Sequence, residues 1–192
     1  MTARTHDLAA ATALAVAILV YTPADLRLST LLVALLANQL GGIAPDIDQP
    51  TAPFWRNLPA THYIGKLFGK LLGGHRFISH SLIGFALFSW LANLLLHFLH
   101  PIMPHVDIQL VWYAFMIGYL SHLVMDSLTK EGVPWLLPIP FKFGFPPLRR
   151  FRITTGKFME TGVLLPLLVL IAVWLFASHY NQFMALLQHL AR

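Results

Sequence analysis

Histidines and aspartates lie at the ends of several apolar stretches in this 192-residue chain. His122 and Asp126 are four residues apart, so on a helix they would share one face, one turn apart. A neutral imidazole and a carboxylate spaced in this way suit zinc or manganese, whereas magnesium sites more often consist of oxygen ligands alone. The pair predicts part of a metal site, although a pair of this kind can also join two helices through hydrogen bonds alone.

Two more aspartates follow a glycine-rich apolar stretch. Asp46 and Asp48 come after Gly41, Gly42 and Pro45, where a helix must end and the chain can turn. Carboxylates two residues apart can share or bridge metal ions, while the commoner fate of an isolated pair is a charged turn in solvent. Their position at the end of an apolar helix favours the metal site.

A third group precedes the next apolar stretch. His75, Arg76 and His80 stand beside a predicted helix start, where Ser79 or Ser81 could act as the cap. Backbone N–H groups at such a start can receive an anion, and a phosphate oxygen would fit. His75 could instead be a histidine at headgroup level, and Arg76 a topology marker.

His6 and Glu160 complete the candidates. His6 shares a predicted helix face with a stripe of alanines, which lets membrane helices pack closely and would carry the imidazole into the bundle. Glu160 could be a ligand or a general base, or a carboxylate favoured by the dipole at a helix N-terminus.

The elements that position these groups must be membrane helices. Apolar residues make up 57% of the chain and charged residues 11%, which excludes an ordinary soluble domain. A transmembrane helix needs about 20 mostly apolar residues. Five stretches qualify, at residues 8–22, 28–44, 81–100, 109–128 and 161–178, and the first is expected to be retained rather than cleaved as a signal peptide. The chain has no cysteine, so metal ligands must be nitrogen or oxygen atoms.

Lysine and arginine indicate the orientation. Five spans place the N-terminus and residues 45–80 and 129–160 on one side, which holds 11 of the 13 basic residues and is therefore predicted to be cytoplasmic. Every candidate above lies at this end of the spans, and ionisable groups near a membrane are costly unless paired or bound. The net charge of +5 then reflects topology and anionic headgroups, and no nucleic-acid partner is expected.

Two connecting segments have membrane character of their own. Residues 64–72 carry apolar side chains at helical spacing, opposite Lys66 and Lys70, and predict a short interfacial helix. Residues 133–151 are rich in proline and aromatic residues and predict an irregular loop lying against the bilayer. The expected fold is one all-α domain over residues 1–192, a polytopic bundle of about five transmembrane helices plus the interfacial helix.

These motifs together resemble the YdjM-like family. The residues that carry the resemblance run from His6 to Glu160: His6-Asp7, Gly42 to Asp48, His75-Arg76, Ser79-His80-Ser81, Gly118-Tyr119, His122, Asp126 to Thr129, Gly132, Thr155-Gly156 and Glu160. The family is described as inner-membrane, metal-dependent hydrolases, some under the control of the repressor LexA. It is distantly similar to the zinc-dependent phospholipase C and single-strand nuclease enzymes, which implies phosphoester hydrolysis.

The expected function is a hydrolase at the cytoplasmic face of a bacterial inner membrane. His6, Asp46, Asp48, His80, His122 and Asp126 would bind one or two divalent ions, zinc being favoured and manganese or magnesium possible; His75, Arg76 and Glu160 would be the catalytic groups. The expected substrate is a phospholipid or polyprenyl phosphate, drawn in by Arg149, Arg150 and Arg152. The alternatives are a metal-ion transporter or non-catalytic metal-binding protein, and an intramembrane metallopeptidase, for which the HExxH motif is missing. The oligomeric state stays open.

Overall fold

The computed structural model describes residues 1–21, 23, 26–49, 77–139 and 141–190. Among them, five helices are long and apolar enough to cross a membrane, which confirms the predicted all-α membrane bundle. The expected interfacial helix at residues 64–72 lies outside the described residues.

The helices begin and end within a few residues of the predicted spans. The bundle contains α1 (Ala3–Val20), α2 (Leu28–Ile43), α5 (Leu82–Leu99), α6 (Ile108–Ser127) and α7 (Leu165–Ser178), with a final helix α8 (Tyr180–Leu190). Short 3-10 turns η1 (Ala44–Asp48), η2 (His100–Ile102) and η3 (Arg149–Phe151) extend or follow them, and the π-helical turn η4 (Met159–Leu164) leads into α7. Side-chain caps fix two starts, because Ser81 accepts from Gly84 N and Asp107 accepts from Gln109 N and Leu110 N.

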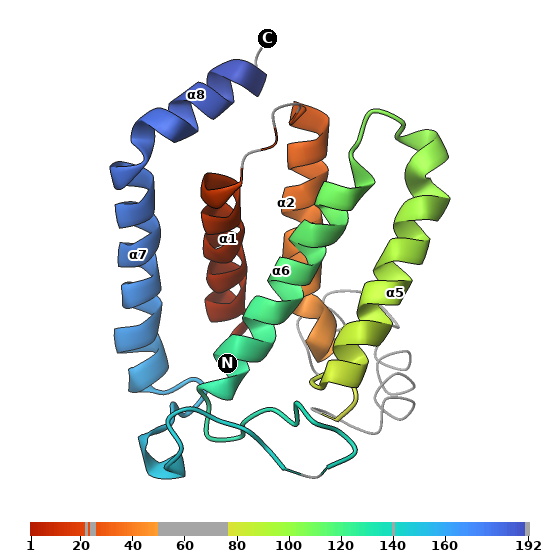
Figure 1. The fold of residues 1–192 in the computed structure, drawn as a ribbon. Coiled ribbons are helices and arrows are strands. Elements are labelled where there is room, and N and C mark those ends of the chain that lie inside the picture. Colours follow the sequence, from red (N-terminus) through yellow and green to blue (C-terminus); the bar gives the residue numbers. More distant parts are fainter. Residues whose placement is uncertain (22, 24–25, 50–76, 140, 191–192) are drawn as a thin grey trace, which may run out of the picture.

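Helix α6 is the centre of the bundle and packs against α1, α2 and α5 (Figure 1). It approaches α2 so closely that backbone meets backbone. A Cβ added at Gly118 would lie 2.0 Å from the carbonyl oxygen of Asn38, and one added at Gly41 would lie 2.0 Å from that of Phe115. The buried Asn38 amide also donates to Ala114 O at 3.0 Å. Small residues and an interhelical hydrogen bond are the usual means of joining membrane helices, because lipid removes the hydrophobic drive between them.

The segment after α6 is the predicted irregular loop. Val133 and Phe143 exchange two backbone hydrogen bonds, of 2.8 and 2.9 Å, that close it, and Phe145 and Phe151 are exposed. The Arg152 guanidinium folds back onto the loop and donates to Pro146 O at 2.8 Å and to Pro147 O at 3.0 Å. Arg152 therefore stabilises the loop. Of the three arginines expected to attract a headgroup, Arg152 uses two guanidinium nitrogens to bind carbonyl oxygens of the protein.

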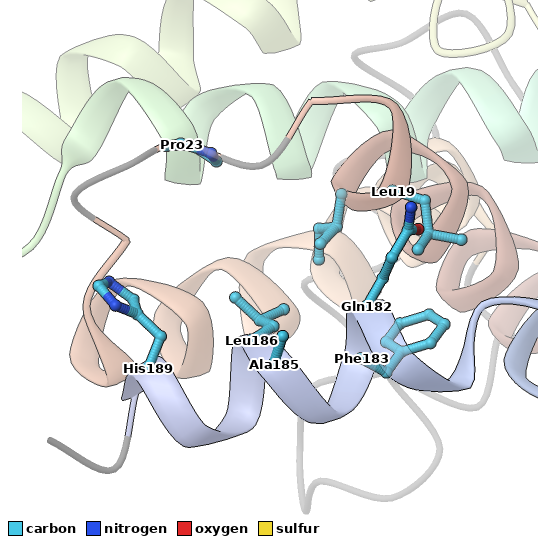
Figure 2. Close-up of a pocket in the computed structure, with 8 residues that line it drawn as sticks. Leu19, Pro23, Gln182, Phe183, Ala185, Leu186 and His189 are labelled. Carbon is cyan, nitrogen blue, oxygen red and sulfur yellow. The ribbon is translucent and has the colours of Figure 1, made fainter.

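Helix α8 lies at the end of the bundle opposite the N-terminus (Figure 1). Gln182, Phe183 and Leu186 line a cleft between this helix and the end of α1, together with Leu19 and Pro23 (Figure 2). The sequence had indicated no element after residue 178, so α8 is an addition to the predicted fold.

Candidate metal centre

Four elements bring five of the predicted ligands to one end of the bundle. The first turns of α1 supply His6, η1 supplies Asp46, the turn before α5 supplies His80, and the last turns of α6 supply His122 and Asp126. The described residues contain two groups whose ligand atoms could hold a metal ion, and both include His122. One is His6, His122 and Asp126, and the other is Asp46, His80 and His122.

The imidazoles of His80 and His122 face two carboxylates. His80 Nε2 lies 3.8 Å from Asp46 Oδ1 and 3.5 Å from Asp126 Oδ2. His122 Nε2 lies 3.7 and 3.8 Å from the same two oxygens. These four distances are longer than an N–H···O hydrogen bond of about 2.7–3.2 Å. Two ligands each about 2.1 Å from one ion can be at most about 4.2 Å apart, so each of these histidine–carboxylate pairs is close enough to share a divalent ion.

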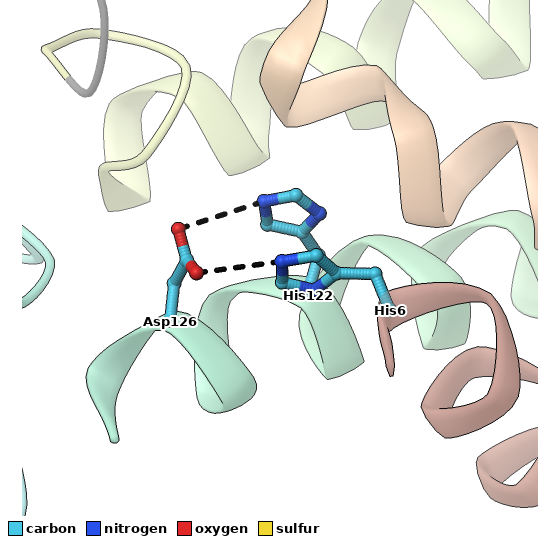
Figure 3. Close-up of side chains that lie close together, drawn as sticks. All are labelled: His6, His122 and Asp126. Atoms are coloured by element: carbon cyan, nitrogen blue, oxygen red, sulfur yellow. Dashed lines mark ion pairs between the residues drawn. The ribbon is translucent and has the colours of Figure 1, made fainter. Parts of the chain in front are cut away.

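His6 adds a fifth ligand beside this set. Its Nε2 lies 3.4 Å from Asp126 Oδ1, and its ring stacks on that of His122 with centroids 3.7 Å apart (Figure 3). The two oxygens of Asp126 therefore face different imidazoles, Oδ1 toward His6 and Oδ2 toward His80 and His122. The amino group of Met1 also lies 2.6 Å from Asp126 Oδ1. A carboxylate placed in this way could serve one ion or bridge two.

Protein contacts behind the imidazoles fix their orientation. His122 Nδ1 lies 2.6 Å from Gly42 O, and a carbonyl only accepts, so Nδ1 carries the proton. Ser79 Oγ donates to Asp48 Oδ2 at 2.5 Å, so toward His80 Nδ1, at 3.0 Å, the hydroxyl must accept. In a neutral ring the lone pair then lies on Nε2, which in both histidines is the atom facing the carboxylates. Metal-binding histidines are commonly held by such a contact at the other nitrogen.

Asp48 occupies a different place from Asp46. Its carboxylate is buried and contacts the Ser79 hydroxyl, and it belongs to neither of the two groups found among the described residues. Tyr119 supports the same turn by donating to Ser79 O at 2.5 Å. The structure thus puts Asp48 behind His80, and its role as a direct ligand stays a prediction. Ser79 and Tyr119 are site residues for which the sequence had given no metal-related role.

Glu160 holds elements together at the rim of the site. Its Oε1 accepts from Thr2 N at 2.6 Å, Thr2 Oγ1 at 2.9 Å and Thr5 Oγ1 at 2.8 Å, while Oε2 accepts from Gly156 N at 2.7 Å. These four donors tie the start of α1 to the turn before α7. A carboxylate engaged in this way is a structural clamp, and its catalytic role stays a prediction.

The remaining predicted residues lie elsewhere. His75 and Arg76 are outside the described residues. Two histidines at the opposite end of the bundle have other partners: His97 Nδ1 lies 2.9 Å from Asn93 O, and His105 Nδ1 lies 3.5 Å from a guanidinium nitrogen of Arg27.

Burial shows from which side the cluster can be reached. His6, His80, His122 and Asp126 are at most 2% exposed as residues, whereas the side chain of Asp46 is 28% exposed. Among these five ligands, Asp46 is therefore the one that solvent reaches most easily.

Comparisons with known proteins agree with this architecture. The model of the family described as "YdjM inner membrane protein" matches residues 1–185. The chain belongs to this family. It is 35% identical over 107 residues to the inner membrane proteins YdjM of Escherichia coli K12 and of Shigella flexneri, which covers 55% of this chain and 50% of each relative. The chain thus aligns with about half the length of these curated relatives.

A more distant relative in the comparison is the Bacillus subtilis 168 protein named "Uncharacterized protein YvsG". It is 24% identical over 128 residues, covering 67% of this chain and 69% of the relative. No solved structure matches. Membership of the YdjM family confirms the resemblance drawn from the His, Asp and Gly motifs and agrees with the predicted inner-membrane location.

Proposed function

We propose that this YdjM-family chain is a metal-dependent hydrolase that cleaves a phosphoester of a membrane lipid or polyprenyl phosphate at the cytoplasmic face. The observation that carries the proposal is the arrangement of His80 and His122. Both rings are held at Nδ1 by protein oxygens, and both Nε2 atoms lie 3.5–3.8 Å from Asp46 and Asp126.

The ligand set favours zinc. Two imidazole nitrogens and two carboxylate oxygens suit zinc, and manganese is the next choice, while magnesium would normally have oxygen ligands and several waters. A bound divalent ion of this kind supplies an activated water and polarises a phosphoryl oxygen. The protein contributes the fixed direction of the histidines and the exclusion of bulk water.

The position of the site suits a lipid substrate. The cluster lies where α1, α6 and the turn before α5 reach the end of the bundle, so a headgroup at the membrane surface can approach it. Arg149 and Arg150, in the segment that joins α6 to α7 at this end of the bundle, are exposed cations that would attract an anionic headgroup. Arg76 would stabilise charge that develops on the phosphoryl group. The excess of basic residues at this end supports a cytoplasmic site.

An activity screen tests the proposal. Purified protein loaded with zinc and reconstituted in proteoliposomes should release phosphate or a phosphorylated headgroup from at least one of phosphatidic acid, undecaprenyl phosphate or a phospholipid. Asp126→Asn should abolish the release, while Glu131→Gln, which removes an exposed carboxylate five residues away, should retain it. Zinc flux across the vesicle wall without lipid turnover would overturn the hydrolase and favour a transporter.

A further inference from the structure

An apolar groove runs along the outside of the bundle between α2 and α5, with α6 as its floor. It has a volume of about 500 Å³. Ala44 and Ile47 line one end, and Leu99 and Met103 line the other. The residues that line it are all apolar, and Leu36 and Leu95 on its two walls are 67% and 56% exposed, so the groove opens sideways toward the hydrocarbon.

The groove is longer than one leaflet. On α2 and η1 its lining runs from Val33 to Ile47, which at 1.5 Å per residue is about 21 Å. The hydrocarbon core of a bilayer is about 30 Å thick, so one leaflet is about 15 Å. A long extended hydrocarbon chain whose phosphate lies at the membrane surface would therefore fit along the groove.

The groove ends at the exposed side of the metal centre. Ala44 and Ile47 belong to η1, the same turn that carries Asp46, and Ile47 is the residue next to it. Asp46 is the ligand whose side chain is 28% exposed. A chain lying in the groove would thus bring the group at its end to the accessible edge of the cluster.

We infer that the α2/α5 groove binds a hydrocarbon chain of the substrate and presents its phosphate to the His/Asp cluster. This inference rests on the proposed lipid phosphoesterase function and adds the site that selects the lipid. A hydrocarbon chain is the occupant that the observations favour, because the groove is apolar throughout and faces the acyl chains around it. Such a substrate enters by lateral movement and never leaves the membrane.

Burial alone gives the groove little affinity inside a bilayer, since acyl chains are as apolar as the leucines that line it. Its contribution is positional: it holds the phosphate at one place beside Asp46. With short-chain substrates dissolved in water, each added methylene would raise kcat/KM by up to about fourfold, because apolar surface is then removed from water.

Photo-crosslinking tests the inference without relying on turnover. The probe is hexadecyl phosphate with a diazirine at mid-chain, added to proteoliposomes of phosphatidylcholine that contain the zinc-loaded protein. Peptides from α2 and α5 should be labelled several-fold more than those from α7, although the span that contains α7 is the least buried within the bundle, at 6% against 11% for that of α5 and 39% for that of α2. Excess unlabelled hexadecyl phosphate should remove this preference. Diazirine-labelled hexadecanol, which lacks the phosphate, should label all exposed helices alike.

Two matched variants connect the labelling with the groove. Ala92→Phe fills the groove from α5 and should abolish the preferential labelling. Ala177→Phe adds the same ring to the exposed surface of α7 and should leave the labelling unchanged. Both proteins must show the same thermal unfolding profile in detergent, and Ala37→Phe, which fills the groove from α2, is the second blocking variant.

The possible outcomes distinguish hydrocarbon binding in the groove from the proposed hydrolase activity. Uniform labelling of lipid-exposed helices, or labelling that survives Ala92→Phe and Ala37→Phe, overturns the inference even if lipid phosphates are hydrolysed. If unlabelled hexadecyl phosphate suppresses the labelling of α2 and α5 but no lipid is hydrolysed, the result supports hydrocarbon binding in the groove and overturns the proposed hydrolase activity.

Discussion

His122 on α6 and Gly42 on α2 are joined by a hydrogen bond of 2.6 Å from the imidazole Nδ1 to the glycine carbonyl oxygen. The bond exists because Gly41 and Gly118 let the two helix backbones touch one turn away. A packing feature of the membrane bundle therefore decides which nitrogen of a candidate metal ligand carries the lone pair. The orientation of the site and the stability of the bundle are coupled at this interface.

Gly118→Ala should separate α2 from α6. The added methyl group would lie 2.0 Å from Asn38 O, which is backbone and cannot move away cheaply. We expect a loss of about 1–3 kcal/mol in the free energy of unfolding, together with weaker metal binding. Thermal unfolding and zinc content of the detergent-solubilised protein measure both effects. Gly162→Ala is the control, because the atoms nearest to its methyl group would belong to the movable Phe158 ring rather than to backbone. Equal behaviour of the two variants would contradict this account.

Ser79→Ala should weaken the metal site without removing a ligand. The hydroxyl links Asp48 to His80 Nδ1, and loss of such a contact typically lowers metal affinity about 10–100-fold. Competition with a chelator of known affinity gives the change. Ser121→Ala, which removes a hydroxyl bonded only to Gly118 O on α6, should bind zinc as the wild type does. Unchanged affinity in Ser79→Ala would show that the hydroxyl does not support His80.

Glu160→Gln distinguishes a clamp from a catalytic group. The carboxylate accepts four hydrogen bonds from Thr2, Thr5 and Gly156. In glutamine, the NH2 group would replace one accepting oxygen and would face an N–H or O–H donor with which it cannot form a hydrogen bond. We expect the free energy of unfolding to fall by about 1–3 kcal/mol while zinc stays bound. Thr5→Val, which removes one of the donors, should lower stability in the same direction. Full stability with complete loss of turnover would instead assign Glu160 to catalysis.

The orientation can be tested by cysteine labelling, because the chain has no native cysteine. Lys130 and His105 are exposed and lie at opposite ends of α6. The positive-inside rule predicts that a membrane-impermeant maleimide labels His105→Cys in intact spheroplasts and Lys130→Cys only after lysis. The reverse pattern would place the metal centre on the outer face of the membrane.

The sequence predicts the spans well because their hydropathy is strong. It also predicts that His6, Asp46, His80, His122 and Asp126 gather at one end, since an alternating topology leaves few other arrangements. Spacing alone does not decide which of Asp46 and Asp48 faces the histidines; the 3-10 turn of η1 decides it. The partners of Glu160 are equally hidden, because Thr2 and Thr5 lie more than 150 residues away in the chain.

Two other features could not be predicted from residue counts or hydropathy. The guanidinium of Arg152 turns inward onto carbonyls of its own loop, which no basic-residue count can show. Helix α8 is short and amphipathic rather than apolar, so a search for membrane spans passes over it. The spacing of Phe183 and Leu186, three residues apart on the face that lines the cleft, is the signal that could have revealed it.

Metal analysis tests the central claim most directly. The purified wild-type protein, His122→Ala, Asp126→Ala and the distant control His97→Ala should be supplied with zinc, washed and measured by elemental mass spectrometry. The account predicts stoichiometric zinc in the wild type and in His97→Ala, and its loss in both cluster variants while all four proteins remain folded. A wild-type protein that retains no zinc, manganese or magnesium, or cluster variants that retain as much as the wild type, would contradict it.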